Sequence, residues 1–204
     1  MSYGEFTIDD IRDKLNLTIQ DVTAVIFPIQ LTQPTSLLKE TLSENTPLAL
    51  AIDTEKARSE LIVAPILVEL RKMCDCQIIF FSGTDLTIDK EKGLNGVCDF
   101  IVSQSAEQLF LDAPVFTLVE AKNDNIKSGI PQCIAEMVAA RLFNQKRGNS
   151  IPRIYGAVTT GSLWKFMKLE DDKVYIETMD YFIENIETIL GILIQIVRDT
   201  RLQE

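Results

Sequence analysis

The stretch Val115-Phe116-Thr117-Leu118-Val119-Glu120-Ala121-Lys122 decides the fold of this chain of 204 residues. Its first part is almost continuously apolar, a pattern typical of a central β-strand that is covered on both faces. The run ends in Glu120 and Lys122, and because side chains alternate along a strand, both belong to one face. The stretch therefore predicts an inner strand that ends in a pair of opposite charges.

A neighbouring strand is predicted at Gly96–Ser103, and it carries Asp99. Charged side chains are costly in an apolar strand unless something pairs with them. Two carboxylates that converge at adjacent strand ends can share a divalent cation, and a nearby ammonium can pair with a water or a phosphate oxygen. Asp99, Glu120 and Lys122 together indicate phosphodiester hydrolysis, whereas each alone is more often a solvated or ion-paired residue.

Helices and further strands are predicted around these two. A capped helix is expected from Thr7 to about Leu15, and a short one over Ser36–Leu42 before a turn signal at 43–47. The apolar run 22–31 should contain a strand. A long helix should begin at Thr54 and bend at Pro65, and another should follow Ser128-Gly129 with Pro131 near its first turn. Additional strands are expected over 77–82, 154–160, 163–169 and 174–178, with a final apolar helix over 184–198.

This order of elements predicts an α/β (α+β) fold with a central mixed β-sheet flanked by helices. The length favours a single domain over residues 1–204. Within it, residues 1–53 would form an N-terminal elaboration, 54–169 the core, and 170–204 a C-terminal hairpin strand and helix.

The composition excludes several kinds of catalysis. The chain has no histidine, which removes serine and cysteine mechanisms that depend on it, histidine zinc sites and phosphohistidine transfer. Its four cysteines show neither redox nor zinc-knuckle spacing, so free thiols are expected. Catalysis would then depend on carboxylates and lysine, with or without a metal ion.

The formal net charge of −10 and the pI near 4.6 run against DNA binding, which draws much of its affinity from cations that contact phosphates. A local positive face would have to come from the cations around and beyond Glu120: Lys122, Lys127, Arg141, Lys146, Arg147, Arg153, Lys165 and Lys168. The first residues lack a signal-peptide pattern, and the apolar stretches are too short to span a bilayer. We therefore expect a cytoplasmic protein with no membrane partner.

With Asp99 on the second core strand and Glu120-Ala121-Lys122 on the third, the chain resembles the PD-(D/E)XK nuclease superfamily, whose fold is restriction-endonuclease-like. Residues 59–70 are also similar to the N-terminal nuclease region of type I restriction subunits. Cys98 stands where the motif's name has proline.

The resemblance implies a Mg²⁺- or Mn²⁺-dependent nuclease that acts on DNA. Asp99, Glu120 and the Ala121 carbonyl would bind the metal, and Lys122 would assist the attacking water or the charged transition state. Glu60 would act as the superfamily's first-helix acid, Gln132 would brace the lysine or a phosphate, and Glu136 is a weaker candidate.

Two other interpretations stay open. A catalytically inactive descendant could serve as a binding or assembly module, with a homodimer through the C-terminal helix, whose apolar residues exceed what one small core needs. A sugar- or nucleotide-binding protein is a third interpretation, against which stands the lack of a glycine-rich phosphate loop. Trp164 and Phe166 could stack on a base, although alternate aromatic residues of a strand more often belong to the core.

Overall fold

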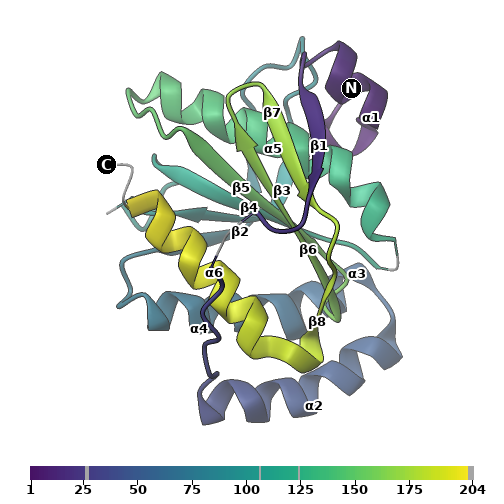
Figure 1. Ribbon diagram of the computed structural model, residues 1–204, viewed down its shortest axis with the longest axis vertical. Helices are drawn as coiled ribbons and strands as arrows, with labels where there is room; N and C mark the ends of the chain where they lie inside the picture. Colours follow the sequence, from purple (N-terminus) through teal and green to yellow (C-terminus); the bar gives the residue numbers. More distant parts are fainter. Residues whose placement is uncertain (26–27, 106, 124, 202–204) are drawn as a thin grey trace.

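The apolar run that begins at Val115 forms strand β4 (Val115–Ala121), and each of its residues is buried, as expected of a strand covered on both faces. In the computed structural model, which describes residues 1–25, 28–105, 107–123 and 125–201, β4 lies inside a mixed eight-stranded sheet (Figure 1). Helices flank this sheet, which confirms the predicted α/β class.

The strands follow the order β1-β7-β6-β5-β4-β3-β2 across the sheet, and β8 pairs with β6. β4 runs parallel to β5, and β1 runs parallel to β7, whereas the other neighbouring pairs are antiparallel. The bounds are β1 Thr18–Val22, β2 Ile79–Asp85, β3 Val97–Ser103, β5 Arg153–Thr159, β6 Leu163–Glu170, β7 Lys173–Glu177 and β8 Tyr181–Phe182. Because Phe100 pairs with Val119, Asp99 of β3 comes to the end of β4 that carries Glu120.

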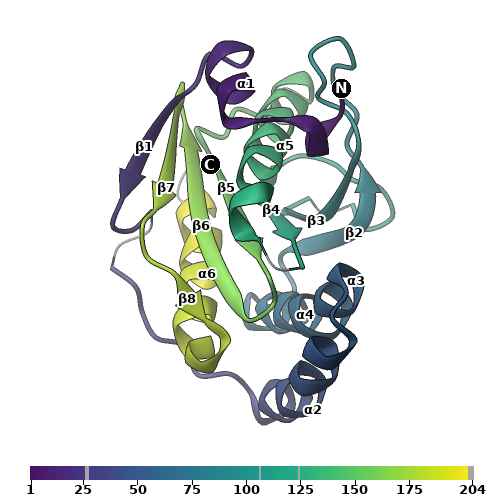
Figure 2. The ribbon, with the colours of Figure 1, turned by 90° about the vertical axis from the view of Figure 1, so that its right-hand side faces the viewer.

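Helices cover both faces of the sheet (Figures 1 and 2). On one face, α1 (Ile8–Asp13) and α5 (Ile126–Lys146) share a core cluster with β4 and β5. On the other, α4 (Ala64–Met73) and α6 (Ile186–Arg201) enclose a second cluster, and α2 (Ser36–Ile52) packs outside α4. The described residues also form two 3₁₀ turns, Tyr3–Glu5 and Ile183–Asn185, and a further helical segment precedes α4.

The helical region from Thr54 forms as predicted, but it has three parts. Thr54 caps α3 (Glu55–Arg58), a π-helical turn follows over Ser59–Val63, and α4 continues from Ala64. Pro65 has no N–H to donate to the carbonyl of Leu61, and the side chain of Asn45 in α2 donates to that carbonyl instead, at 3.0 Å. The proline is therefore tolerated because a neighbouring helix supplies the missing donor.

Three local expectations were wrong. The turn expected at 43–47 is helical, because α2 runs from Ser36 to Ile52 with Pro47 inside it. Pro131 lies beyond the first turn of α5, since that helix already begins at Ile126 after its Asn125 cap. The strand expected in the run 22–31 lies earlier, as β1, and of that run only Val22 belongs to a strand among the residues described; positions 26 and 27 lie outside them.

The apolar face of α6 is used within the chain. Ile189, Leu190, Leu193 and Val197 are at most 1% exposed, and Ile194 is also buried. The surplus that suggested a homodimer through this helix therefore packs against the chain's own core, where α2, α4 and the sheet contribute to the same cluster. Among the described helices, none combines the length and the apolar character that a membrane span requires.

Candidate active site

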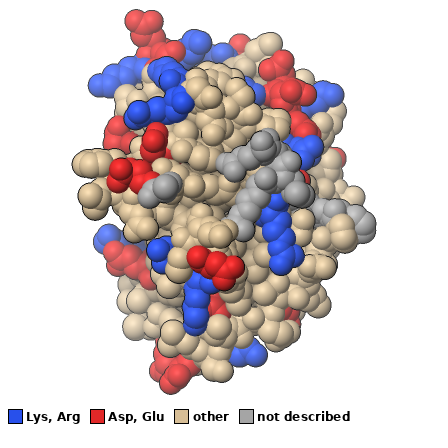
Figure 3. Space-filling view, turned by 90° about the vertical axis from the view of Figure 1, so that its left-hand side faces the viewer, with Lys and Arg blue, Asp and Glu red and all other residues tan. Residues whose placement is uncertain are grey.

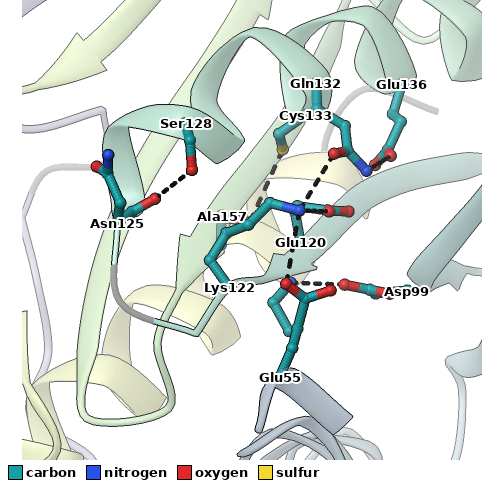
Figure 4. Close-up of polar contacts among 11 residues, drawn as sticks. Glu55, Asp99, Glu120, Lys122, Asn125, Ser128, Gln132, Cys133, Glu136 and Ala157 are labelled. Carbon is teal, nitrogen blue, oxygen red and sulfur yellow. Dashed lines mark hydrogen bonds and ion pairs between the residues drawn. The ribbon is translucent and has the colours of Figure 1, made fainter. Parts of the chain in front are cut away.

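Asp99, Glu120 and Lys122 lie together where β3 begins and β4 ends (Figure 4). α5 contributes Gln132 and Glu136 from one side, and α3 contributes Glu55 from the other. This convergence was predicted for Asp99, Glu120, Lys122 and Gln132. We call these four residues, with Glu55 and Glu136, the Lys122 cluster.

The ion pair between Glu120 and Lys122 is the centre of the cluster. Lys122 Nζ lies 2.6 Å from Glu120 Oε1, and the exposed fractions of the two side chains are 18% and 2%. Burial raises the pKa of Glu120 to about 7, the charge of Asp99 also raises it, and Lys122 opposes both. Burial acts to lower the pKa of Lys122, but the nearby carboxylates, Glu120 first, outweigh it and the pKa is raised. Lys122 is therefore an ammonium at neutral pH, a cation rather than a base.

Asp99 is held by the backbone of the neighbouring strand. Its Oδ2 accepts a hydrogen bond from the amide N–H of Ala121 at 2.8 Å. Burial raises the pKa of Asp99, and this hydrogen bond and the charge of Lys122 oppose the rise. Ala121 thus fixes Asp99 through its N–H, a contact that the sequence did not reveal; the role of its carbonyl as a ligand stays a prediction.

α5 provides a hydrogen-bonded chain behind the lysine. Lys122 Nζ donates to Gln132 Oε1 at 3.2 Å, and Gln132 Nε2 donates to Glu136 Oε1 at 3.1 Å. Glu136 is completely buried, and burial and the charge of Glu120 hold its pKa well above the usual range. Gln132 therefore contacts the lysine as predicted, and Glu136 is closer to the site than the sequence indicated.

Gly129 allows α5 to approach the lysine so closely. A Cβ at this position would lie 3.0 Å from Lys122 Cγ and 2.7 Å from Val158 Cγ1. Contacts that short force a neighbour to move, so a side chain at position 129 would displace either the lysine or the helix. In the sequence, Gly129 indicates only the start of a helix, so this role was not predicted.

The acid that α3 and its π-helical turn direct at Lys122 is Glu55, not Glu60. Glu55 Oε2 lies 3.9 Å from Lys122 Nζ. Glu60 is exposed and pairs with Lys56 at 2.8 Å. Both glutamates still line one hollow of about 240 Å³, together with Lys56, Ser59, Ser82, Gly83 and Asp99. The proposed first-helix acid therefore borders the entrance to the site, and its role stays a prediction.

Arg58 fixes the position of α3. Its guanidinium donates to the Thr160 carbonyl and to Asp53 Oδ1, both at 2.9 Å, although it is buried. Gly161, the next residue of the β5–β6 turn, has a φ of 82°, which favours glycine, and a Cβ there would lie 2.9 Å from Ile62 Cδ1. These contacts seat Glu55 at the end of β4.

The acids of the cluster fit a hard divalent cation in part. Glu120 is buried, the charge of Asp99 helps to raise its pKa, and its side chain also meets Glu136, so two carboxylates of adjacent strands interact here. Carboxylate oxygens are the ligands that Mg²⁺ prefers, and its sites commonly use one or two carboxylates and complete the shell with water. Within the described ranges, no three cysteine, aspartate or glutamate side chains are already grouped as metal ligands. Asp99 and Glu120 would thus supply a two-carboxylate site.

The two aromatic residues of β6 belong to the core. Trp164 and Phe166 are completely buried and stack with ring centroids 6.1 Å apart. The indole N–H of Trp164 donates to the Gly161 carbonyl. Neither ring is available to a base.

Among the residues that the structure describes, five of the eight cations expected to form a positive face pair with acids, Lys122 with Glu120 among them. Arg153 contacts Glu170 and Asp199, and other cations of this set form the pairs Lys165–Asp180, Lys168–Glu170 and Arg147–Asp112. On the face shown in Figure 3, Lys and Arg are interspersed with Asp and Glu over a largely uncharged surface. The expected local positive face is not seen there.

The sequence was compared with protein families and with curated proteins, and neither comparison found a match. The geometry of the Lys122 cluster is therefore the basis for any functional assignment.

Proposed function

We propose that this chain is a metal-dependent nuclease that hydrolyses DNA phosphodiester bonds. The observation that carries the proposal is the Lys122 cluster itself: a buried glutamate paired with a lysine two residues later, beside an aspartate from the adjacent strand. Phosphodiester hydrolysis requires positioned reactants and stabilisation of negative charge. Two acids and a cation at one end of strands β3 and β4 can provide both. The choice of DNA as substrate comes from the resemblance to the PD-(D/E)XK superfamily.

Asp99 and Glu120 would hold the metal ion. When bound, a Mg²⁺ or Mn²⁺ ion supplies a Lewis acid and a more acidic bound water. Lys122 would bind a phosphate oxygen with its ammonium group and stabilise the charge that develops there. Gln132 keeps that ammonium in place from the opposite side.

Cleavage assays test the proposal. The purified chain is incubated with supercoiled plasmid, linear duplex and single-stranded DNA in Mg²⁺ or Mn²⁺. We expect cleavage by the natural sequence and a loss of roughly 100-fold or more in Asp99→Ala, Glu120→Gln and Lys122→Met. Absence of cleavage of all three substrates with both ions would overturn the proposal.

Glu177→Gln is the matched control for Glu120→Gln. Both glutamates are 1% exposed, and burial raises the pKa of each to about 7. Glu177 lies on β7, three strands away from β4. Glu177→Gln should therefore leave the rate of DNA cleavage unchanged.

Calorimetry adds a second measurement, since Asp99→Ala should weaken Mn²⁺ binding about tenfold or more.

A second candidate is a catalytically inactive relative that acts as a binding module. It is favoured by the net charge of −10 and by the acids that pair with Arg153, Lys165 and Lys168, since both weaken the attraction to a phosphate backbone. Metal binding without cleavage would support this alternative.

A further inference from the structure

The hydrogen bonds behind Lys122 have an order that their chemistry fixes. An ammonium group only donates, so Lys122 requires the Oε1 atom of Gln132, which lies 3.2 Å away. The Nε2 group of the same amide then faces Glu136 and donates to its Oε1 at 3.1 Å. With the amide turned over, two donors would face each other at Lys122 and two acceptors at Glu136.

Glu136 is the group that holds this orientation. A carboxyl group presents an acceptor at Oε1 whether or not Oε2 carries a proton, so the contact with Gln132 persists in both states. The two residues are four apart on α5 and therefore share a helix face. That face points at Lys122 in Figure 4.

Packing alone does not account for an acid at position 136. The side chain is completely buried, and the neighbouring α5 residues Cys133, Ala135, Met137 and Ala140 are buried as well. Its carboxyl group also meets Glu120, whose charge and side-chain hydrogen bond help to hold the pKa of Glu136 well above the usual range. An apolar residue would make neither this contact nor the hydrogen bond to Gln132, so the acid at position 136 is explained by the polar side chains of the Lys122 cluster that it meets.

We infer that Glu136 is a positioning residue that orients the Gln132 amide and, through it, the Lys122 ammonium beside Glu120. Its effect on catalysis rests on the proposed nuclease function, whereas its effect on the amide does not. Glu136 touches neither substrate nor reacting atoms in this scheme.

The first test measures the amide and needs no activity. The side-chain NH₂ signal of Gln132 is assigned by its absence in Gln132→Met, and its exchange with solvent is compared with that of the exposed Gln20. We expect slow exchange in the natural sequence and in Glu136→Gln, and fast exchange in Glu136→Leu. Exchange as fast as that of Gln20 in the unaltered protein overturns the inference even if no variant folds.

The second test separates positioning from stability. Glu136→Leu should lower kcat roughly 100-fold with KM for DNA nearly unchanged, because a misplaced cation loses transition-state stabilisation. Glu136→Gln keeps an acceptor and should restore kcat to within about threefold of the natural value. The double variant with Gln132→Met should be no slower than Glu136→Leu alone, since both changes act through one contact.

Glu177→Leu is the matched control, since it replaces another buried glutamate on a distant strand. An equal loss of kcat in Glu177→Leu, or no rescue by Glu136→Gln, overturns the inference. If the unaltered chain cleaves no DNA, the proposed function fails, and the amide exchange still decides the role of Glu136.

Discussion

Two buried glutamates, Glu120 and Glu177, show how the surroundings of a residue decide its use. Burial raises the pKa of each to about 7. Glu120 faces a lysine, whereas Glu177 Oε1 accepts from the backbone N–H of Val25 at 2.7 Å. The first glutamate is therefore part of a charged cluster, and the second tethers the segment after β1.

The raised pKa of Glu177 makes the stability of the fold depend on pH. The folded chain keeps a proton that the unfolded chain loses near the ordinary value of 4.5. The contribution of Glu177 to the free energy of unfolding is therefore fully present below pH 4.5 and is lost as pH rises through about 7. We expect Glu177→Gln to stabilise the protein by about 2 kcal/mol at pH 8 and to change little at pH 4. Urea unfolding at both pH values measures this, and an equal effect at the two would contradict it.

Gly129→Ala should disturb both the fold and the cluster. The added Cβ would contact Val158 and Lys122 at distances that neither can accept without moving. We expect a loss of about 1–3 kcal/mol in the free energy of unfolding, measured in urea. Lys127 is exposed and precedes Gly129 in the same helix, so Lys127→Ala should lower the free energy of unfolding by less than about 0.5 kcal/mol. A fully stable Gly129→Ala would show that α5 can shift without cost.

The sequence located the inner part of the site better than its entrance. Glu120 and Lys122 could be placed because strand alternation fixes their face, and Asp99 because adjacent strands end together. Glu55 could not, because its position depends on Arg58 docking α3 against the turn after β5, a contact between residues far apart in sequence. The role of Gly129 was missed for the same reason, because it depends on how closely Val158 and Lys122 approach the glycine in the folded chain.

At the scale of elements, proline was the main source of error. Pro47 was taken to end a short helix, yet α2 passes through it for five more residues, to Ile52. The strands near β4 were found because burial on both faces leaves a long apolar run. The extended α2 and the π-helical turn pack against each other, and the hydrogen bond from Asn45 to the Leu61 carbonyl joins them. Tertiary contacts of this kind leave no periodic signal in one sequence.

Pro47→Ala should stabilise α2. Pro47 is exposed, lacks the N–H that would continue the helical hydrogen bonds, and is unfavourable in a helix interior. Because proline also restricts the unfolded chain, we expect a net gain of about 1–2 kcal/mol, measured by thermal or urea unfolding.

Pro65→Ala is the comparison for this change. Asn45 already donates to the carbonyl of Leu61, so a new N–H at position 65 would gain less. A larger gain at Pro65 than at Pro47 would mean that the Asn45 contact does not compensate.

At the scale of the whole molecule, the charge distribution limits DNA affinity. The chain has 20 basic and 30 acidic side chains, and in the part of it that the structure describes five of the basic residues that follow Glu120 pair with acids: Lys122, Arg147, Arg153, Lys165 and Lys168. Contact with only two or three phosphates would give a slope of about −2 to −3 for log K against log salt.

Anisotropy of a labelled duplex, titrated with Asp99→Ala between low and moderate salt, measures this slope. A slope steeper than roughly −5 would reveal a basic surface, since each phosphate contact contributes about −0.9.

The pairing of β1 with β7 has a consequence for how the chain reaches its native state. Thr18 lies beside Lys173 and Val22 beside Glu177, so the first strand has no partner until the chain has been synthesised past residue 177. During translation, β1 must stay unpaired while most of the polypeptide leaves the ribosome. The β1–β7 pair therefore forms late and is one of the longest-range contacts of the sheet, which favours slow folding. Until it forms, β1 is an unpaired strand of the nascent chain and is exposed to aggregation.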